Sequence, residues 1–230
     1  EDLKRNVSYL VVVCNGFVTD IGKEKIGLHA DQVIIRENIG FDAWAYKCGV
    51  ESLGWENVLK FDELILLNFT IMGPIFPLHE MFDIMESKGI DFWGITEYTK
   101  VDPDPYKLCK YGYLPKHIQS HFIAVGQRML SSVEFREYWT HLPKIESYQQ
   151  SICFHEAVFT KTFADLGYKW ETYVGSRFDD YCDNMIVNAP VKLIKEARCP
   201  IFKRRSFFHD YSALLSRSLG DCTSDLINYI

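Results

Sequence analysis

Short apolar runs that end abruptly on polar residues alternate with helix-like segments along the first third of the chain. The runs at residues 7–14, 32–35 and 64–68 have the length and composition of buried strands. Helix-like patterns at residues 20–27 and 42–53 separate these strands. Such an alternation predicts an α/β fold with a mostly parallel sheet flanked by helices. In sheets of this kind, ligands bind just outside the carboxyl ends of the strands.

The rest of the chain continues the alternation. Further strands are expected at residues 91–96, 120–126 and 169–174, and further helices at residues 78–87, 133–140 and 151–166. A stretch with three prolines, residues 97–116, reads as a long loop. Long loops inside compact domains usually carry function.

No linker, repeat or low-complexity stretch divides the sequence. We therefore expect one domain over residues 1–178, with a helical C-terminal extension over residues 179–230 that packs on the same domain. The chain lacks an initiating Met and stops within a pattern at Ile230. We expect it to be a fragment of a longer protein, truncated in the extension.

Composition and charge exclude several classes of protein. No apolar run approaches the roughly 18 residues of a membrane span. The seven cysteines are scattered without a C-x-x-C pair, which indicates free thiols in a reducing, cytoplasmic compartment. The net charge of −6 disfavours a nucleic-acid binder. Within residues 192–205, however, six basic residues stand against Glu196 alone. A basic segment on an acidic chain indicates a compact anionic ligand.

Polar residues and a glycine follow the second predicted strand and lead into the next helix. Arg36, Asn38 and Asp42 offer hydrogen-bond donors and acceptors suited to the edge of a base or a sugar. Gly40 allows a backbone to approach a ligand closely. The third strand likewise ends on Asn68, so both strands are expected to bring polar groups to one crevice. The alternative is a plain turn in which Asp42 caps a helix.

Six blocks of the sequence resemble one family of proteins. They are R-E-N-I-G-F-D-A-W-A-Y-K (residues 36–47), L-L-N-F-T-I-M-G-P (66–74), D-F-W-G-I-T (91–96), H-I-Q-S-H-F (117–122), F-R-E-Y-W (135–139) and C-P-I-F-K-R (199–204). In this order they resemble the rhamnan synthesis F family of cell-surface polysaccharide glycosyltransferases. The resemblance covers nearly the whole chain, residues 7–207.

The resemblance implies a fold, a reaction and partners. The implied fold is the glycosyltransferase-A type, a Rossmann-like sheet flanked by helices. The implied reaction is inverting transfer of a deoxysugar, typically L-rhamnose from dTDP-L-rhamnose, onto a growing polysaccharide. The implied partners are a nucleotide-diphospho-sugar donor and a lipid-linked glycan acceptor. They place the protein in the cytoplasm, in peripheral association with the inner face of the cell membrane.

The sequence departs from the glycosyltransferase-A pattern where a metal is usually held. Many such enzymes end the third strand in a D-x-D-like acidic pair, but this chain reads Asn68-Phe69-Thr70. Mg²⁺ and Mn²⁺ prefer carboxylates, so a divalent metal is disfavoured and no metal ligands are assigned. Asp179, Asp180 and Asp183 read more simply as a solvated loop with a helix cap than as a cation site.

Without a metal, positive side chains must neutralise the leaving diphosphate. Lys203, Arg204 and Arg205 follow Pro200 in the block that resembles the family's C-P-x-x-K-R. Cationic clamps of this kind stabilise transition states of phosphate-ester chemistry. The alternative for a K-R-R run is a solvated basic surface.

Inverting transfer needs a base for the acceptor hydroxyl. The place of Glu156, at the start of a predicted helix, resembles the x-E-D block that carries the base in many glycosyltransferase-A enzymes. Asp91 and Glu97 are the competing acids, and any of them can instead be a helix cap or dipole partner.

Six aromatic residues could stack on a base or a sugar: Trp44, Tyr46, Phe92, Trp93, Tyr111 and Tyr113. We expect core packing for most of them, but Trp93, which Gly94 follows at a strand end, is expected to contact a ligand. Gln119 and Ser120 are expected to hydrogen-bond the acceptor. His121 and His155 are expected to be core histidines.

A second function class remains open. The same fold with Phe69 in the strand-end motif is compatible with a nucleotide-sugar or glycan-binding module that has lost catalysis. A hydrolase or kinase is disfavoured because the chain has neither G-x-S-x-G nor G-x-x-x-x-G-K-[ST].

Overall fold

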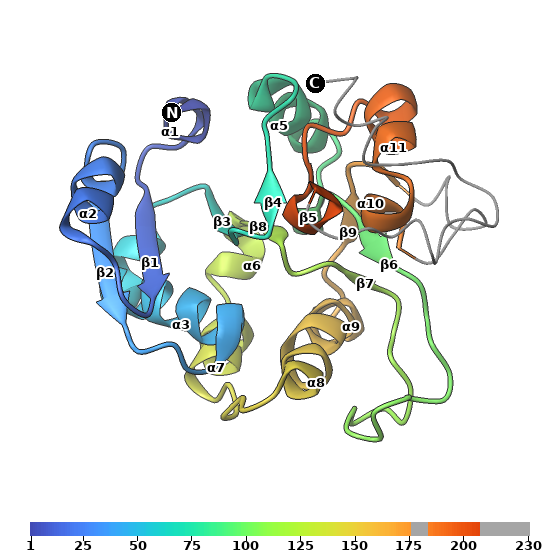
Figure 1. Ribbon diagram of the computed structural model, residues 1–230. Helices are drawn as coiled ribbons and strands as arrows, with labels where there is room; N and C mark the ends of the chain where they lie inside the picture. The colour runs from blue at the N-terminus through green and yellow to red at the C-terminus, as the bar shows by residue number, and fades with distance from the viewer. Residues whose placement is uncertain (176–183, 208–230) are drawn as a thin grey trace.

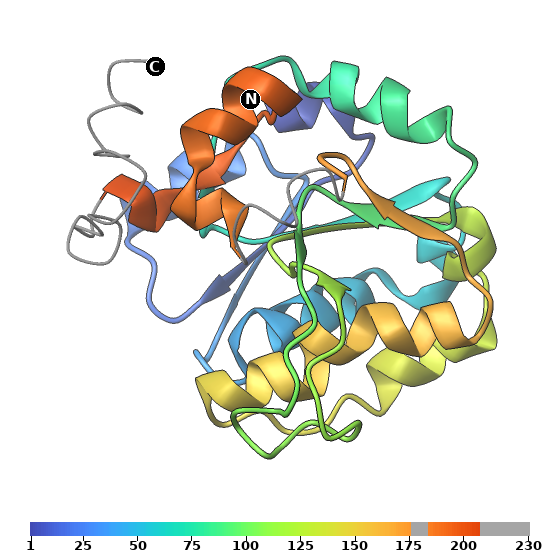
Figure 2. The ribbon, with the colours of Figure 1, turned by 90° about the vertical axis from the view of Figure 1, so that its right-hand side faces the viewer.

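A computed structural model describes residues 1–175 and 184–207 of the chain. The fold is mixed α/β, and Figures 1 and 2 show strands lying between two layers of helices. The first two strands form a parallel pair, β1 (Val11–Asn15) with β2 (Gln32–Arg36), in which Val11 lies opposite Gln32. The α/β class predicted from the alternation is confirmed.

The central sheet has four strands in the order β3, β8, β5, β9. Their bounds are β3 Glu63–Leu67, β8 Phe122–Gly126, β5 Phe92–Gly94 and β9 Trp170–Thr172. β8 is antiparallel to both β3 and β5, and β5 is parallel to β9. The sequence predicted a mostly parallel sheet, but two of these three pairings are antiparallel. An apolar run has the same composition in either direction, so its periodicity cannot reveal that β8 is reversed.

The reversal of β8 still leaves one edge of the sheet suited to a ligand. Since β3 and β5 both oppose β8, they run in the same direction. The carboxyl ends of β3 and β5 and the amino end of β8 therefore lie at the same edge. The polar residues at 68–70 and 119–120 flank that edge.

Two small antiparallel pairs complete the strands. β4 (Ile71–Met72) pairs with β10 (Phe202–Lys203), which carries residues near 203 to the end of β3. β6 (Glu97–Tyr98) pairs with β7 (His117–Ile118), and a bridge joins Val101 to Leu114. The predicted long loop is therefore closed at its base by strand pairing.

The helices follow the predicted pattern closely. Those at Asp20–Gly27 and Val133–Thr140 have the predicted bounds, while the helix expected at residues 151–166 is divided by a π-helical turn. The helical segments are α1 Asp2–Asn6, α2 Asp20–Gly27, α3 Phe41–Leu53, α4 Trp55–Val58, α5 Leu78–Glu86, α6 Gln127–Leu130, α7 Val133–Thr140, α8 Tyr148–Ser151, η1 Ile152–Glu156, α9 Ala157–Asp165, α10 Met185–Asn188, α11 Pro190–Ala197 and η3 Arg204–Phe207. Within the described residues, no helix has both the length and the apolarity needed to cross a bilayer.

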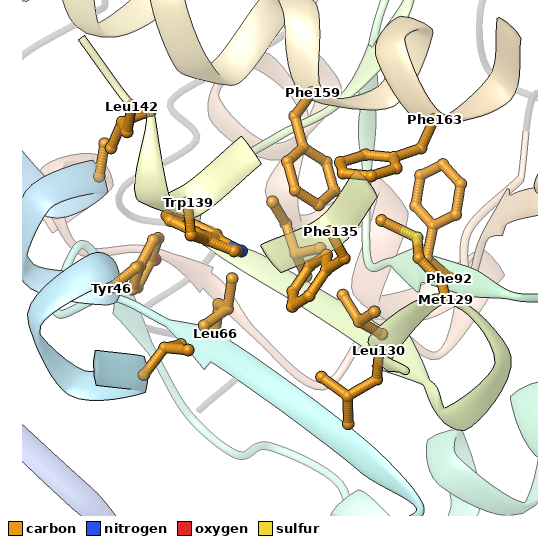
Figure 3. Close-up of a cluster of buried hydrophobic side chains, with 14 of the residues drawn as sticks. Tyr46, Leu66, Phe92, Met129, Leu130, Phe135, Trp139, Leu142, Phe159 and Phe163 are labelled. Atoms are coloured by element: carbon orange, nitrogen blue, oxygen red, sulfur yellow. The ribbon is translucent and has the colours of Figure 1, made fainter. Parts of the chain in front are cut away.

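The two faces of the central sheet bury separate hydrophobic clusters, because neighbouring strand residues point to opposite sides. On one face, Phe92 belongs to a hydrophobic cluster with the helix residues Phe135, Trp139 and Phe159, which Figure 3 shows. Phe92 and Phe159 meet edge to face, with ring centroids 6.0 Å apart. This face is covered by α3, α7 and α9.

The opposite face is covered by α5, α10 and α11. Trp93 and Phe122 point to this side and pack with Met81 of α5. Ile186 and Leu193, from the part of the chain expected to be the extension, are fully buried in the same cluster. The predicted boundary between residues 178 and 179 lies outside the described residues.

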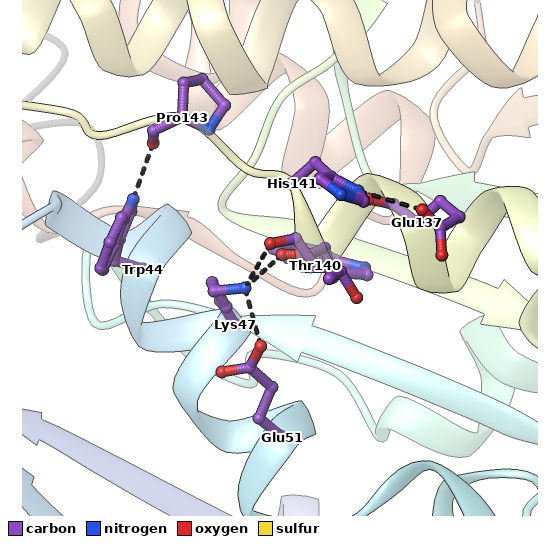
Figure 4. A network of polar contacts seen from close by, with 8 residues as sticks. Trp44, Lys47, Glu51, Glu137, Thr140, His141 and Pro143 are labelled. Atoms are coloured by element: carbon purple, nitrogen blue, oxygen red, sulfur yellow. Dashed lines mark hydrogen bonds and ion pairs between the residues drawn. The ribbon is translucent and has the colours of Figure 1, made fainter.

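Helix α3 is anchored to α7 by polar contacts, which Figure 4 shows. Lys47 Nζ donates to the carbonyl oxygens of Trp139 (2.5 Å) and Thr140 (3.1 Å), and it pairs with Glu51 at 2.7 Å. A cation at the C-terminal end of α7 also complements the helix dipole. These contacts set the direction of α3, whose first turn reaches the ligand-side edge of the sheet.

Candidate active site

A cleft of about 1670 Å³ lies between β1 and β3 and includes this edge of the sheet. Its lining comes from the full length of β1 and β3, the segments that precede them, one side of α3, the loop after β6, the segment before β8, α8 with η1, and residues 203–205. Eight residues predicted as site residues line it: Asn38, Asp42, Asn68, Thr70, Gln119, Glu156, Lys203 and Arg204. The structure therefore brings most of the predicted residues together, although they span 166 positions, from 38 to 204.

The predicted meeting of two strand ends is confirmed at Asp42 and Asn68. Asn68 Nδ2 donates to Asp42 Oδ2 at 2.8 Å, which joins the end of β3 to the first turn of α3. Asp42 is not the N-cap of α3, since that position is Gly40, although Asp42 Oδ1 accepts from the Ala43 amide at 3.0 Å. Asp42 lines the cleft.

Gly40 has a local role rather than a ligand contact. It precedes α3 with a φ of 75°, and a Cβ added there would lie 2.2 Å from Trp44 Cγ. Glycine is therefore required to start α3 at this point. Gly40 does not line the cleft.

Arg36 does not line the cleft either, but it contacts a residue that does. Its guanidinium donates to Asn15 Oδ1 at 2.7 Å and to the Ile39 carbonyl at 2.9 Å. Asn15 in turn donates to the Phe41 carbonyl at 3.1 Å and lines the cleft. Arg36 thus ties the ends of β1 and β2 to the start of α3, and it holds Asn15 in place.

Lys203 contacts the residues at the end of β3, Asn68-Phe69-Thr70, where the sequence resemblance led us to look for a metal site. Pairing of β10 with β4 brings Lys203 Nζ to 2.9 Å from Thr70 Oγ1. Thr70 donates from Oγ1 and from its amide to Asn68 Oδ1, at 2.5 and 3.1 Å. An amide and a hydroxyl that hold an ammonium group do not fit a hard divalent ion.

The environment of Lys203 changes its titration. Burial lowers the pKa of Lys203 to about 8; the nearby Glu156 carboxylate opposes this shift, Arg205 adds to it, and Asp42 opposes it. Arg204 and Arg205 are exposed beside it on the cleft wall. Arg204 is fixed through its amide, which donates to the Thr70 carbonyl at 2.8 Å. The K-R-R run is therefore a cleft wall and not a remote basic surface.

Glu156 is the acid that the fold brings into the cleft. It ends the π-helical turn η1 (Ile152–Glu156), and such turns are often found at functional sites. Its Oε1 accepts from the Ser120 amide at 3.0 Å. Ser120 Oγ lies 3.4 Å from Asp42 Oδ2, and Tyr46 donates to the Ser120 carbonyl at 2.8 Å. Ser120 thus stands between the two carboxylates.

The histidines near this site are core residues, as expected for His121 and His155. Tyr138 OH lies 2.9 Å from His155 Nδ1, and burial lowers the pKa of His155. Burial, reinforced by the charge of Lys203, holds the pKa of His121 well below its usual value. Both rings are therefore neutral at physiological pH.

Two of the acids considered as the base lie away from the cleft. Asp91 Oδ2 accepts from Arg128 at 2.6 Å and from the Lys169 amide at 2.7 Å, at the opposite end of β5. Glu97 pairs with Lys116 at 2.8 Å. Neither acid lines the cleft. Asp91 is therefore a structural anchor, and we do not retain it as a base.

Trp93 is buried in the core and does not reach the cleft. Only 3% of its surface is exposed, its Nε1 donates to Glu63 Oε1 at 2.7 Å, and its ring packs on Phe122 at 5.1 Å. Its position before Gly94 suggested a ligand contact, but the short β5 places it under α5. The glycine serves packing, since a Cβ there would lie 2.1 Å from Ile118 Cγ2.

Several cleft residues were missed by sequence reasoning. Asn15 follows β1 just as Asn68 follows β3, a signal that the strand-end rule could have found. Tyr98, Tyr106 and Tyr148 also line the cleft, but composition alone assigned such aromatics to the core. Asp179, Asp180 and Asp183 lie outside the described residues. Among residues 1–175 and 184–207, no three His, Cys, Asp or Glu side chains gather in a metal-binding arrangement.

Comparisons with known proteins bear on nearly the whole chain. Residues 10–230 match the family described as Rhamnan synthesis protein F. A stretch of 161 residues, 69% of this chain, is 24% identical to the uncharacterized protein y4gN of Sinorhizobium fredii (strain NBRC 101917 / NGR234). The match spans 39% of that protein's length. No solved structure matches. Because the family match covers more than nine-tenths of the sequence, the chain belongs to the rhamnan synthesis protein F family.

Proposed function

We propose that this protein is an inverting glycosyltransferase. It moves a deoxysugar, L-rhamnose from dTDP-L-rhamnose, onto a growing cell-surface polysaccharide. Family membership supports a role in rhamnan synthesis. The observation that carries the proposal is that one cleft holds a carboxylate, Glu156, and a lysine ammonium, Lys203, which are linked through Ser120, Asp42, Asn68 and Thr70.

The cationic wall is suited to the donor diphosphate. Negative charge develops on the bridging oxygen as the bond to the sugar breaks, and Lys203 with Arg204 and Arg205 stabilises it. Because the strand-end residues hold Lys203, we propose that the reaction proceeds without a divalent metal. Asn15, Asn38 and Asp42 offer the polar groups that orient the nucleotide and the sugar.

Glu156 is proposed as the general base. The acceptor oxygen attacks the anomeric carbon, the bond from that carbon to the diphosphate oxygen breaks, and Glu156 takes the acceptor's proton. The amide of Ser120 fixes one carboxylate oxygen, which leaves the other for the acceptor. In-line attack requires the acceptor to approach from the side opposite the diphosphate.

The proposed partners follow from this chemistry. The donor is a nucleotide-diphospho-sugar, and the acceptor is a lipid-linked glycan, which calls for peripheral association with the inner face of the cell membrane. A cytoplasmic location is supported by free cysteines in the described fold, of which Cys109, Cys153 and Cys199 are buried. Nucleic acid is not a proposed partner.

Substitution of the two central residues tests the proposal. Glu156→Gln keeps size and hydrogen bonding but removes the base, so turnover of dTDP-L-rhamnose should fall about 10²–10⁴-fold with donor affinity nearly intact. Lys203→Ala should weaken both donor binding and turnover, because the diphosphate is charged in the ground and transition states alike. Glu146→Gln, an exposed acid that pairs with Lys144, is the matched control and should change neither.

Measuring both binding and turnover of dTDP-L-rhamnose also distinguishes a glycosyltransferase from the rival function. Phe69, which is 78% exposed, stands between Asn68 and Thr70 where a metal-binding motif would carry an acid, and this is compatible with a nucleotide-sugar or glycan-binding module without catalysis. In that case the wild-type protein would bind dTDP-L-rhamnose but release no dTDP from it. Complete loss of turnover with EDTA, restored by Mn²⁺, would instead contradict the metal-free mechanism.

A further inference from the structure

Three tyrosines line the cleft from elements other than β10, which carries Lys203. Tyr98 belongs to β6, Tyr106 to the loop of residues 99–116, and Tyr148 begins α8. Tyr148 is 59% exposed and Tyr106 is 36% exposed, so their rings are open to a ligand. Figures 1 and 2 show this loop beside α8. These three residues are called the tyrosine wall below.

The tyrosine wall shares the cleft with the proposed base. Its three side chains line the cleft together with Glu156 and Arg205. Burial raises the pKa of Tyr148, and the Glu156 carboxylate raises it further; Arg205 lowers it, while Tyr106 and Tyr98 contribute smaller upward shifts. The wall therefore faces the same cleft as the group that Glu156 would deprotonate.

The supporting structure holds the tyrosine wall in place. Tyr98 stacks on the buried ring of His117, with centroids 5.7 Å apart and planes 23° apart. Asp104 accepts hydrogen bonds from the amides of Tyr106 at 2.9 Å and of Cys109 at 2.7 Å. A rigid aromatic surface binds a ligand at a lower entropic cost than a mobile loop does.

We propose that the tyrosine wall is the acceptor subsite and binds the apolar face of an uncharged pyranose ring. Sugar rings present C–H groups to the negative face of an aromatic ring, and a 6-deoxy sugar adds a methyl group. This inference rests on the proposed function, because the donor diphosphate is assigned to Lys203 on β10, which leaves the tyrosine wall for the acceptor.

Binding of two simple probes tests the subsite. Methyl α-L-rhamnopyranoside stands for the acceptor, and dTDP for the leaving half of the donor; each is titrated by NMR into the folded protein. Tyr148→Ala should weaken rhamnoside binding about two- to tenfold, the range expected for one aromatic contact. Adding Tyr106→Ala should weaken it by more than tenfold. Affinity for dTDP should stay unchanged in both variants.

Tyr113→Ala is the matched control. Tyr113 lies on the same loop, with Lys100 4.5 Å from its ring centroid, but it does not line the cleft. Its removal should leave the affinities for both probes unchanged. Equal weakening by Tyr113→Ala would show that loop order, not stacking, governs binding, and would overturn the inference.

The other outcomes are also decisive. Loss of dTDP affinity in Tyr148→Ala with unchanged rhamnoside affinity would assign the wall to the nucleotide base and overturn the acceptor subsite. Failure of the wild-type protein to bind the rhamnoside would overturn the proposed ligand class. If the rhamnoside binds the wall as expected but dTDP does not bind and dTDP-L-rhamnose is not turned over, the proposed function fails while the glycan subsite stands.

Discussion

At the scale of single residues, the surroundings of Lys203 shift the pKa of its ammonium group. Its ammonium is held by Thr70 Oγ1 at 2.9 Å, and burial lowers its pKa to about 8. A lysine with a pKa near the pH of the cell is charged or neutral according to what binds beside it. A diphosphate would favour the charged form.

This residue predicts a pH dependence of donor binding. Below a pH of about 8 Lys203 is charged and attracts the diphosphate, and above it the free protein loses that charge. Affinity for dTDP should therefore fall as pH rises from 7 to 9.5. In Lys203→Arg, whose guanidinium stays protonated, the fall should be much smaller. Calorimetric titration measures both profiles, and identical profiles would show that Lys203 does not contact the ligand.

Gly40 gives a stability prediction at the same scale. Gly40→Ala places a Cβ at a φ of 75° and 2.2 Å from Trp44 Cγ, whereas Gly112→Ala has a φ of 74° with no atom within 4 Å. The shared strain costs about 1–2 kcal/mol, and the clash adds about 1–3 kcal/mol at Gly40 alone. Urea unfolding should thus find Gly40→Ala the less stable variant. Equal losses would mean that the Trp44 ring moves freely.

At the scale of elements, the loop of residues 99–116 is ordered by one carboxylate. Asp104 is buried and accepts from the amides of Tyr106, Leu108 and Cys109 at 2.9, 2.7 and 2.7 Å. Burial alone would raise the pKa of Asp104, but these hydrogen bonds outweigh it and lower the pKa. Asp104 therefore stabilises the folded protein fully above the pKa that its carboxyl group has in the unfolded chain. This stabilisation is lost as pH falls through the lower pKa of Asp104 in the folded protein.

Replacing this carboxylate should loosen the loop. Asp104→Asn removes the charge and one acceptor, which leaves buried amides without partners at a cost of about 1–3 kcal/mol. Amides of residues 105–114 should exchange with deuterium faster, as hydrogen–deuterium exchange measures. Asp102→Asn, at an exposed position of the same loop, should change stability by about 0.5 kcal/mol or less. Unchanged exchange in Asp104→Asn would show that the Val101–Leu114 bridge alone suffices.

At the scale of the whole molecule, the strands fall into units with different burial. β1 and β2 pair with each other and, within residues 1–175 and 184–207, share no ladder with the four-stranded sheet. The residues of β1 are all half-buried, while Phe122, Ile123, Ala124 and Val125 of β8 are at most 1% exposed. Local opening costs least where few apolar contacts are buried.

This difference predicts two levels of protection. Native-state hydrogen exchange should show β1 and β2 opening at a lower free energy than β8, since β8 opens only with the whole sheet. Saturating dTDP should raise the protection of β1 and β2 more than that of β8, because Asn15 at the end of β1 lines the cleft. A single opening free energy for all three strands would mean that the molecule unfolds as one unit.

The sequence by itself determined those features that depend on neighbouring residues. Periodicity and capping residues are local, so α2 and α7 have the predicted bounds, and the polar ends of the strands were recognised as cleft residues. Asp42, Asn68 and Glu156 were identified in this way and by family resemblance. Gly40 was predicted to contact a ligand, but it does not line the cleft and instead starts α3.

The tertiary structure alone decided what depends on direction and on distant partners. The composition of an apolar strand is the same for a parallel and an antiparallel neighbour, so the sequence did not predict that β8 is antiparallel to β3 and β5. The composition of a strand also does not reveal which face of the sheet a residue points to, or which end of the strand lies at the cleft. Asp91 and Trp93 were therefore predicted as site residues, but neither lines the cleft. The contact between Lys203 and Thr70 joins residues 133 positions apart. Such a pairing arises only when β10 packs against β4, because no local energy term couples positions so far apart in the chain.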